Sequence, residues 1–298
     1  MNSRKNIIGV WILVLCIITS CIISCRNQEE TTGDNVFTDD YGRAVTVPVH
    51  PQRIVSTSPA VTEIIYALGV ASRLVGRTDF CTYPPEALEI ESIGGISNLN
   101  IEKVISLKPD LVISGSMISK KITTQMEKLG VPTVCVIEKK NFDGLYENIA
   151  KIGELIDRPE AADSLNRELR LRVAQLPHKD KTTHGQTAYY VVGYGKSGNF
   201  TAGGNSYIND ILNMSGLKNV AEDLAGWEYG LEALIEADPD YIIIRKEDSL
   251  SFCQMEPYTM LKAVRNGKVI AIESGMIDIQ TPRNLEAIEL LTQKTLLK

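Results

Sequence analysis

The sequence predicts an α/β protein of two Rossmann-like lobes, joined by a single long helix and separated by a ligand cleft. Short apolar runs alternate with helical patterns in the first half of the chain, and the alternation restarts near residue 185. Such βαβ alternation is typical of parallel sheets. Between the halves, residues 159–176 form one helical pattern, which spans about 27 Å at ~1.5 Å per residue. A helix of this length can hold two lobes apart.

The N-terminal α/β lobe is expected over residues 36–142. Its first helix begins where Ser58 precedes Pro59, because serine is a favoured N-cap and proline suits the first helical turn. Glu63 is expected to support that turn. The helix ends near Gly69, since glycine suits the left-handed position after a helix. The other expected elements of this lobe are strands over 53–56, 74–76, 110–114 and 132–137, and helices over 101–105 and 120–129.

Connecting helices are expected over residues 143–184. The first covers about 143–156, and the second, the interlobe helix, follows the break at Asp157 and Pro159. A polar loop over 177–186 leads into the C-terminal α/β lobe, residues 185–298. That lobe is expected to contain strands over 188–192, 241–244 and 268–272, a helix over 205–214 ended by Gly216, and a final helix that begins over 284–291.

An internal repeat supports the division into two lobes. Residues 102–113 and 232–243 share one frame, in which a glutamate opens a short helix, Pro-Asp follows, and an apolar strand comes next. A common helix–turn–strand unit explains most of this frame. It does not explain why an acidic residue, Glu102 or Glu232, stands at the same place in both copies.

The N-terminus has the layout of a bacterial lipoprotein signal. Arg4 and Lys5 precede an apolar run over residues 7–23, and a small residue, Ser24, precedes Cys25. The competing interpretation is a transmembrane helix, which needs about 20 apolar residues. We expect a signal peptide over 1–24, lipidation at Cys25, and a tether over 25–35. Cys21 fits the same pattern, but cleavage there leaves two isoleucines exposed. The protein is therefore expected to be exported and lipid-anchored at the membrane, facing the periplasm or the cell exterior.

Composition excludes several classes of function. The formal charge of −6 becomes −8 once residues 1–24 are removed, whereas nucleic-acid binding needs a basic surface. The three histidines have no neighbouring ligand at metal-site spacing, so no metal centre is expected. Three cysteines lie beyond the signal, namely Cys81, Cys135 and Cys253, so at most one disulfide is expected; we interpret all three as small hydrophobic residues.

Two enzyme interpretations find little support. Residues 193–198 contain Gly-Lys-Ser, but a P-loop needs a glycine where Tyr190 stands. An exported hydrolase is the alternative from a different class. No G-x-S-x-G motif is present, and the few histidines make a Ser-His-Asp triad hard to build. We therefore expect a protein that is not an enzyme.

The chain resembles the substrate-binding proteins of ABC importers for iron siderophores and vitamin B12. The resemblance covers about residues 36–298 and rests on 37–43 with Pro48 and Pro51, on 53–56, on 107–112 and on the long linking helix. It implies a monomer whose cleft closes little on binding. It also implies a permease dimer with a cytoplasmic ATPase as partner. Glu102 and Glu232 match the family's docking glutamates, which meet permease arginines through charge-assisted hydrogen bonds.

The closest resemblance is to the cobalamin-binding members. Residues 80–87 are similar to a loop of those members in which an aromatic-x-x-Tyr-Pro-Pro segment lines the cleft. A corrin is a flat, mostly apolar macrocycle with amide arms, so it needs aromatic walls and a few polar contacts. The expected ligand-binding residues are Phe80, Tyr83, Pro84, Ile96, Tyr194, Trp227, Met276, Asp278 and Gln280.

Two departures keep other ligands open. Ile96 and Gly115 stand where cobalamin binders can carry tryptophan. A ferric siderophore would use cleft arginines, for which Arg77 and Arg283 are available, although Arg283 also suits a structural role. Haem is the remaining alternative. No cofactor is expected besides the transported ligand.

Overall fold

The computed structural model describes residues 34–177 and 185–296. The expected signal peptide, Cys25, Cys21 and nearly all of the expected tether lie outside these residues. Strand β1 includes Asp34 and Asn35, the last two residues of that tether. Among the described residues, no helix has both the length and the apolar character needed to cross a membrane.

Each lobe is built on a four-stranded sheet whose strands are parallel, as predicted, although only three of the four strands of the second lobe were predicted. The first sheet has the order β4-β3-β5-β6 and the second has the order β10-β9-β7-β8. When the strands are numbered in chain order within each lobe, the first sheet reads 2-1-3-4, and the second sheet, read from β8 to β10, also reads 2-1-3-4. The lobes therefore share one topology. The first sheet contains β3 (Ile54–Ser56), β4 (Leu74–Arg77), β5 (Leu111–Ser114) and β6 (Thr133–Cys135). The second contains β7 (Thr187–Tyr190), β8 (Lys218–Asn219), β9 (Tyr241–Arg245) and β10 (Val269–Ile272).

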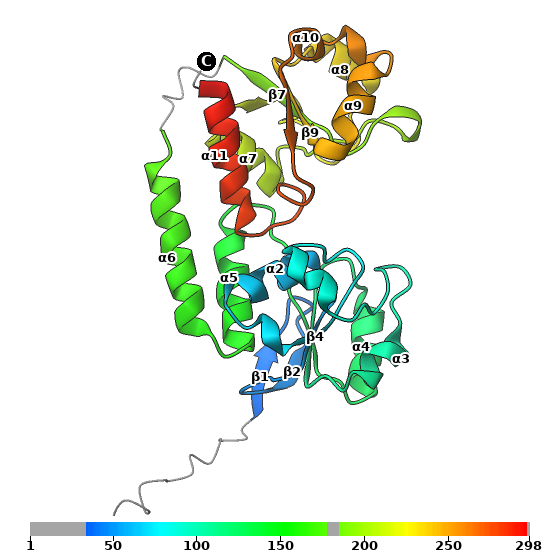
Figure 1. Ribbon diagram of the computed structural model, residues 1–298, viewed down its shortest axis with the longest axis vertical. Helices are drawn as coiled ribbons and strands as arrows, with labels where there is room; N and C mark the ends of the chain where they lie inside the picture. Colours follow the sequence, from blue (N-terminus) through cyan, green and yellow to red (C-terminus); the bar gives the residue numbers. More distant parts are fainter. Residues whose placement is uncertain (1–33, 178–184, 297–298) are drawn as a thin grey trace, which may run out of the picture. The chain divides into compact units, whose positions relative to one another are not determined.

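Helices cover these sheets, and several were predicted with nearly the same bounds (Figure 1). They are α2 (Pro59–Ala67), α3 (Ile101–Ser106), α4 (Lys120–Lys128), α5 (Gly144–Leu155), α6 (Pro159–Gln175), α7 (Tyr207–Met214), α8 (Leu231–Ala237), α9 (Lys246–Gln254), α10 (Lys262–Arg265) and α11 (Arg283–Leu296). Short 3-10 turns occur at η1 (Ala71–Arg73), η2 (Pro85–Glu89), η4 (Gly195–Ser197) and η5 (Tyr258–Met260). The sequence did not predict α9, α10, β8 or the two-stranded sheet of β1 (Asp34–Thr38) and β2 (Ala44–Pro48).

The long helix α6 is present as predicted. It packs along α5, and Arg172 on α6 binds Glu289 on α11 through two hydrogen bonds of 3.1 and 2.8 Å. The segment between the lobes is therefore tied to the last helix of the chain.

Alternate strand residues enter different cores, because side chains of a strand point to opposite faces of its sheet. Ile54, Leu111, Tyr190 and Ile243 point into a large core that also contains residues of α5, α6 and α11 and extends through both lobes. Val55 and Val112 point into a smaller core on the other face of the first sheet, and Tyr189 and Ile242 do so on the second. The three cysteines of the described residues are free, and Cys135 is a buried strand residue as predicted.

The Pro-Asp pair of the internal repeat has the same structural task in both lobes. Asp110 accepts hydrogen bonds from the backbone N–H groups of Gln52 and Arg53, at 2.7 and 2.9 Å. Asp240 accepts one from the N–H of Thr187 at 2.8 Å. Each aspartate therefore fixes the start of the first strand of its lobe against the start of the third.

Candidate functional site

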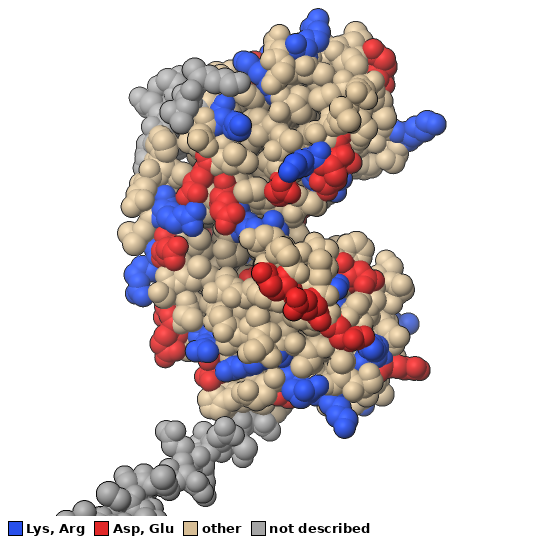
Figure 2. Space-filling view, in the orientation of Figure 1, with Lys and Arg blue, Asp and Glu red and all other residues tan. Residues whose placement is uncertain are grey.

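A cleft of about 580 Å³ lies between the lobes and is visible as the hollow in Figure 2. In the first lobe it is lined by residues that follow β3 and β5, among them Ser58 and Ser116. In the second it is lined by Val192, which follows β7, and by Arg245 at the end of β9. In an order 2-1-3-4, the first and third strands of a lobe are neighbours: β3 and β5 in the first sheet, β7 and β9 in the second. The chain continues from these two strands toward opposite edges of the sheet. Ligands of open parallel sheets bind at the carboxyl ends of strands at such a point.

Exposed apolar side chains from both lobes form the walls of the cleft. Phe80 and Tyr83 of the first lobe are 57% and 41% exposed, and Trp227 of the second is 50% exposed. Met117 lies on the first-lobe wall and is 70% exposed. Large aromatic side chains usually lose most of their surface on folding. Their exposure in a concave site therefore leaves apolar area for a ligand to cover.

Tight backbone contacts fix Trp227. Its carbonyl accepts a hydrogen bond of 2.8 Å from Thr201 N–H. The preceding chain lies so close to Gly203 that a Cβ there would stand 2.1 Å from the carbonyl oxygen of Leu224. Only glycine permits this approach. The indole is therefore carried on a loop whose path is set by backbone packing.

A buried ion pair between the lobes lies at the cleft. Arg283, at the start of α11, donates to both carboxylate oxygens of Glu63 on α2, at 2.8 and 2.5 Å. Burial alone would lower the pKa of Arg283, but the hydrogen bonds and charge of Glu63 outweigh it and raise that pKa. The ring of Tyr83 stacks on the guanidinium at 3.9 Å. The expectation that Glu63 supports the first turn of its own helix was wrong, because its carboxylate is used between the lobes.

Two further carboxylates face the cleft, one from each lobe. Glu138 accepts a hydrogen bond of 2.5 Å from Ser116 Oγ. Asp278 accepts one from the hydroxyl of Tyr190, and burial together with this carboxylate raises the pKa of Tyr190, so the phenol stays protonated. The cationic lining residues already have anionic partners, since Arg245 pairs with Asp248 at 2.8 Å and Arg283 pairs with Glu63. The charge that remains for a ligand is therefore negative.

The structure brings five of the nine residues expected to bind the ligand to the cleft wall, namely Phe80, Tyr83, Ile96, Trp227 and Asp278. Pro84, Tyr194, Met276 and Gln280 are not among its lining residues. Tyr194 packs edge-on against Phe252 and Tyr258 at 5.3 and 5.9 Å between ring centroids.

The other three lie in structural positions. Gln280 is fully buried, accepting from Lys139 N–H at 2.9 Å and donating to the carbonyl of Asn141 at 2.8 Å. Pro84 precedes η2, and Met276 packs against the large core.

The two arginines considered for a siderophore, Arg77 and Arg283, have other partners, and Arg77 does not line the cleft. Arg77 is buried and donates to the carbonyls of Ala87, Thr78 and Leu88, so it shapes the loop that carries Phe80 and Tyr83.

Gly115 lines the cleft, and a Cβ there would stand 2.6 Å from the Cβ of Ser58. A large side chain at Gly115 therefore requires a shift of the chain, which explains the absence of an aromatic wall at this point.

Sequence reasoning missed several lining residues, among them Thr57, Ser116, Glu138, Tyr207, Arg245 and Ser274. Several directly follow or end a predicted strand of their lobe. Their position at the carboxyl end of a strand could have identified them from the sequence, because the carboxyl ends of parallel strands meet at one edge of a sheet.

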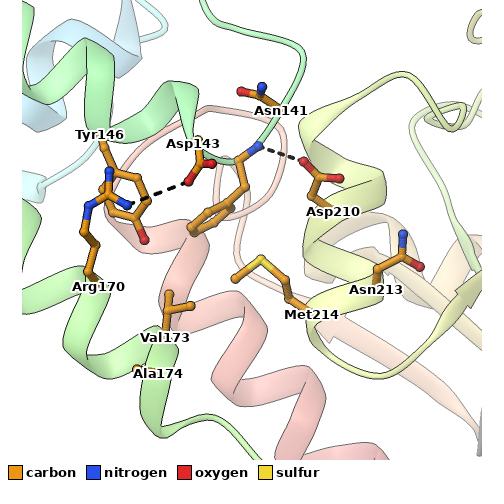
Figure 3. A pocket seen from close by; sticks show the side chains of 10 residues that line it. Asn141, Asp143, Tyr146, Arg170, Val173, Ala174, Asp210, Asn213 and Met214 are labelled. Carbon is orange, nitrogen blue, oxygen red and sulfur yellow. Dashed lines mark hydrogen bonds and ion pairs between the residues drawn. The ribbon is translucent and has the colours of Figure 1, made fainter. Parts of the chain in front are cut away.

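A second hollow, of about 450 Å³, lies where α5, α6 and α7 meet (Figure 3). Arg170 stacks on the Tyr146 ring at 3.8 Å, and Phe142 N–H donates to Asp210 at 2.8 Å. Figure 3 shows the labelled polar side chains around an apolar floor that includes Val173 and Met214. None of the residues expected to bind the ligand lines this hollow.

Glu102 and Glu232 are exposed on α3 and α8. Within residues 34–177 and 185–296, neither carboxylate has an ion-pair partner. Both are therefore free to meet a cation on another molecule. The described part of the chain also contains no cluster of three His, Cys, Asp or Glu residues suited to a metal.

Comparisons with known proteins agree with this architecture. Residues 54–275 match the model of a family described as periplasmic binding protein. The chain is 29% identical to the uncharacterized ABC transporter substrate-binding lipoprotein YvrC of Bacillus subtilis, over 97% of both chains. It is 27% identical to a cobalamin-binding protein of Halobacterium salinarum, over 83% of this chain and 70% of the other.

A solved structure from Staphylococcus epidermidis, a possible iron-binding (periplasmic solute-binding) protein, superposes with a TM-score of 0.69 at 26% identity. The superposition covers 83% of this chain and 99% of that one. The family match extends from β3 to just beyond β10 and so includes both four-stranded sheets and most of the residues that line the cleft.

Proposed function

The chain belongs to the periplasmic binding protein family, and from this premise we propose that its cleft captures a corrinoid, a vitamin B12-like ligand, for an ABC importer. The chain is an extracytoplasmic solute-binding protein of such an importer and not an enzyme, as expected from the sequence. It works with a permease and an ATPase.

The observation that carries the corrinoid proposal is the pair of exposed aromatic walls. Phe80 and Tyr83 on one lobe face a cleft that Trp227 lines from the other. A flat apolar macrocycle covers such walls efficiently, because aromatic side chains offer large rigid contact areas. A cobalamin-binding relative supports the same ligand class.

The charge of the lining supports a neutral ligand. Glu138 and Asp278 offer acceptors to amide N–H donors, while both lining arginines are held by carboxylates. An anionic ferric complex, or a haem with its two carboxylates, would bring negative charge to a cleft without a free cation. Like charges at short range disfavour such binding.

Isothermal titration of residues 26–298 with cyanocobalamin, haemin and a ferric siderophore tests the proposal. A one-to-one isotherm in the micromolar range or tighter, with cyanocobalamin alone, is the expected result. Binding of the ferric siderophore or haemin without cyanocobalamin would contradict the corrinoid assignment while leaving the binding-protein function intact. A likeness to a possible iron-binding protein makes the ferric siderophore the main alternative.

Two glutamates and an N-terminal cysteine connect the protein to its permease and to the membrane. Glu102 and Glu232 contact arginines of the permease dimer, and a lipid at Cys25, or at Cys21, holds the exported protein at the membrane, facing the periplasm or the cell exterior. Mass spectrometry of the mature N-terminus tests the anchor. An N-terminal cysteine that carries two or more acyl chains is expected, and an unmodified N-terminus would contradict the anchor.

A further inference from the structure

The helices α3 and α8 occupy equivalent places in the two lobes. Each is the helix that leads through Pro-Asp into the third strand of its lobe. Each packs through a fully buried residue, Val104 or Leu234, on the face of its sheet that points away from the large shared core. Even the backbone before the proline repeats, with φ of 48° at Lys108 and 36° at Asp238.

An exposed isoleucine follows each glutamate by three residues. Ile105 is 38% exposed and Ile235 is 37% exposed. Residues three apart on a helix are neighbours on one surface, so each helix presents a carboxylate beside an apolar side chain. Neither isoleucine belongs to the packed cores of its lobe.

Packing in the interior explains why apolar residues recur at the buried positions of the repeat, but it does not explain why an isoleucine recurs at this exposed position. A single exposed apolar residue is ordinary on a protein surface. Here, however, the same residue recurs at the same place although neighbouring exposed positions differ, since Ser106 in one copy corresponds to Glu236 in the other. The chain therefore has two matching surface elements, one on each lobe. Figure 1 places both helices on the side of the molecule away from α6.

We propose that Ile105 and Ile235 are apolar contacts of a duplicated docking surface, each inserted into the permease beside the site that receives the glutamate. The proposal rests on the proposed function as an importer component. A partner made of two identical subunits fits two matching elements, because it offers the same contact twice. Each half of that partner has a cation next to an apolar depression. A central apolar contact bordered by a charged pair is a common arrangement in specific interfaces.

The test compares Ile105→Gln/Ile235→Gln with a matched control, Leu129→Gln/Leu250→Gln. Glutamine is uncharged and favours helices, so the helix is preserved. The control residues are also exposed, at 52% and 68%, with one on each lobe. The readouts are stimulation of the ATPase of the source organism's ABC importer in nanodiscs and, separately, titration with cyanocobalamin.

The isoleucine variant is expected to need at least about tenfold more protein for half-maximal stimulation, with cyanocobalamin affinity unchanged. The control is expected to behave as wild type. Stimulation equal to wild type by the isoleucine variant would overturn the proposal, even if cyanocobalamin binds. A wild-type dimer that the isoleucine variant abolishes, seen by light scattering, would reassign the surface to self-association. Absence of cyanocobalamin binding in wild type would contradict the corrinoid assignment but not the docking surface.

Discussion

At the residue scale, Trp227 gives the cleft a built-in reporter. The sequence has two tryptophans, and the other, Trp11, lies in the expected signal peptide. The soluble form from residue 26 onward therefore has one indole, which lines the cleft and is half exposed. A ligand that covers it changes the fluorescence of the whole protein.

We expect cyanocobalamin to quench this fluorescence and Trp227→Ala to weaken binding by roughly tenfold or more, as for other interface aromatics. The reason is the lost contact area on the second-lobe wall. Titration calorimetry measures the affinity, and Trp227→Phe serves as a conservative control that retains most of it. Unchanged affinity in Trp227→Ala would remove its role in the cleft wall.

Tyr194 is expected to behave in the opposite way. Its ring packs against Phe252 and Tyr258, and its hydroxyl contacts Ser251 Oγ at 2.7 Å. Tyr194→Ala should lower the free energy of unfolding by about 2 kcal/mol, because it leaves a cavity beside aromatic neighbours. Denaturant unfolding measures this change. A loss of ligand affinity with normal stability would return Tyr194 to the binding site.

Tyr194 and Gln280 show which property of the site the sequence could not predict, namely the direction in which a loop side chain points. The motifs located the right segments, but a loop residue can point into the cleft or into its own lobe. Tyr194 and Gln280 point inward because partners distant in sequence, Phe252 and Lys139 among them, receive them. No local pattern contains those partners.

At the element scale, a helix or strand could be predicted from the sequence when its apolar periodicity extended over enough residues. Strands and helices with clear apolar periodicity were found within a few residues, and Gly69 has the predicted positive φ, at 74°. The two-residue strand β8 is too short to have a pattern. Helix α9 buries only Phe252 among its residues, so its sequence shows little amphipathic character.

Asp40 ties the small β1–β2 sheet to the first lobe. It accepts hydrogen bonds from Ile137 N–H at 2.7 Å and from the ammonium groups of Lys139 and Lys151 at 3.0 and 2.6 Å. Burial alone would raise the pKa of Asp40, but these contacts outweigh it and the pKa lies below its ordinary value. The carboxylate therefore stabilises the fold above its unfolded-state pKa of about 3.9, and this stabilisation is lost as the pH falls through the lower folded-state pKa.

Asp40→Asn should accordingly reduce stability at neutral pH by about 1–2 kcal/mol, and the difference from wild type should shrink below about pH 4. Urea unfolding across this pH range measures it. Asp163→Asn is the control, since Asp163 is exposed on α6 and is in no ion pair among the described residues. A difference between Asp40→Asn and wild type that does not change with pH would contradict the ionic role of Asp40.

At the scale of the whole molecule, the surfaces proposed for ligand capture and for docking on the permease are different. The cleft residues lie at the strand ends, whereas Glu102 and Glu232 lie on α3 and α8 and do not line the cleft. The two activities should therefore be separable by mutation.

Glu102→Arg/Glu232→Arg is expected to abolish uptake through the importer while leaving ligand affinity unchanged, because reversed charges repel the arginines expected on the permease. Uptake in cells and titration of the purified variant measure the two effects. Glu127→Arg is unsuitable as a control because Glu127 pairs with Arg43, whereas Glu160→Arg reverses a charge on exposed α6. Normal uptake by the double variant would remove the docking assignment.

The large core that extends through both lobes has a consequence for how the chain melts. The lobes share buried residues of α5, α6 and α11, and the described residues from Asn35 onward form one compact unit. Neither lobe can lose its structure without exposing apolar surface of the other. Scanning calorimetry should therefore show one heat-absorption peak, with equal van't Hoff and calorimetric enthalpies. Two resolved peaks would mean that each lobe carries its own stability; a single peak means that a destabilising change in either lobe lowers the melting temperature of both.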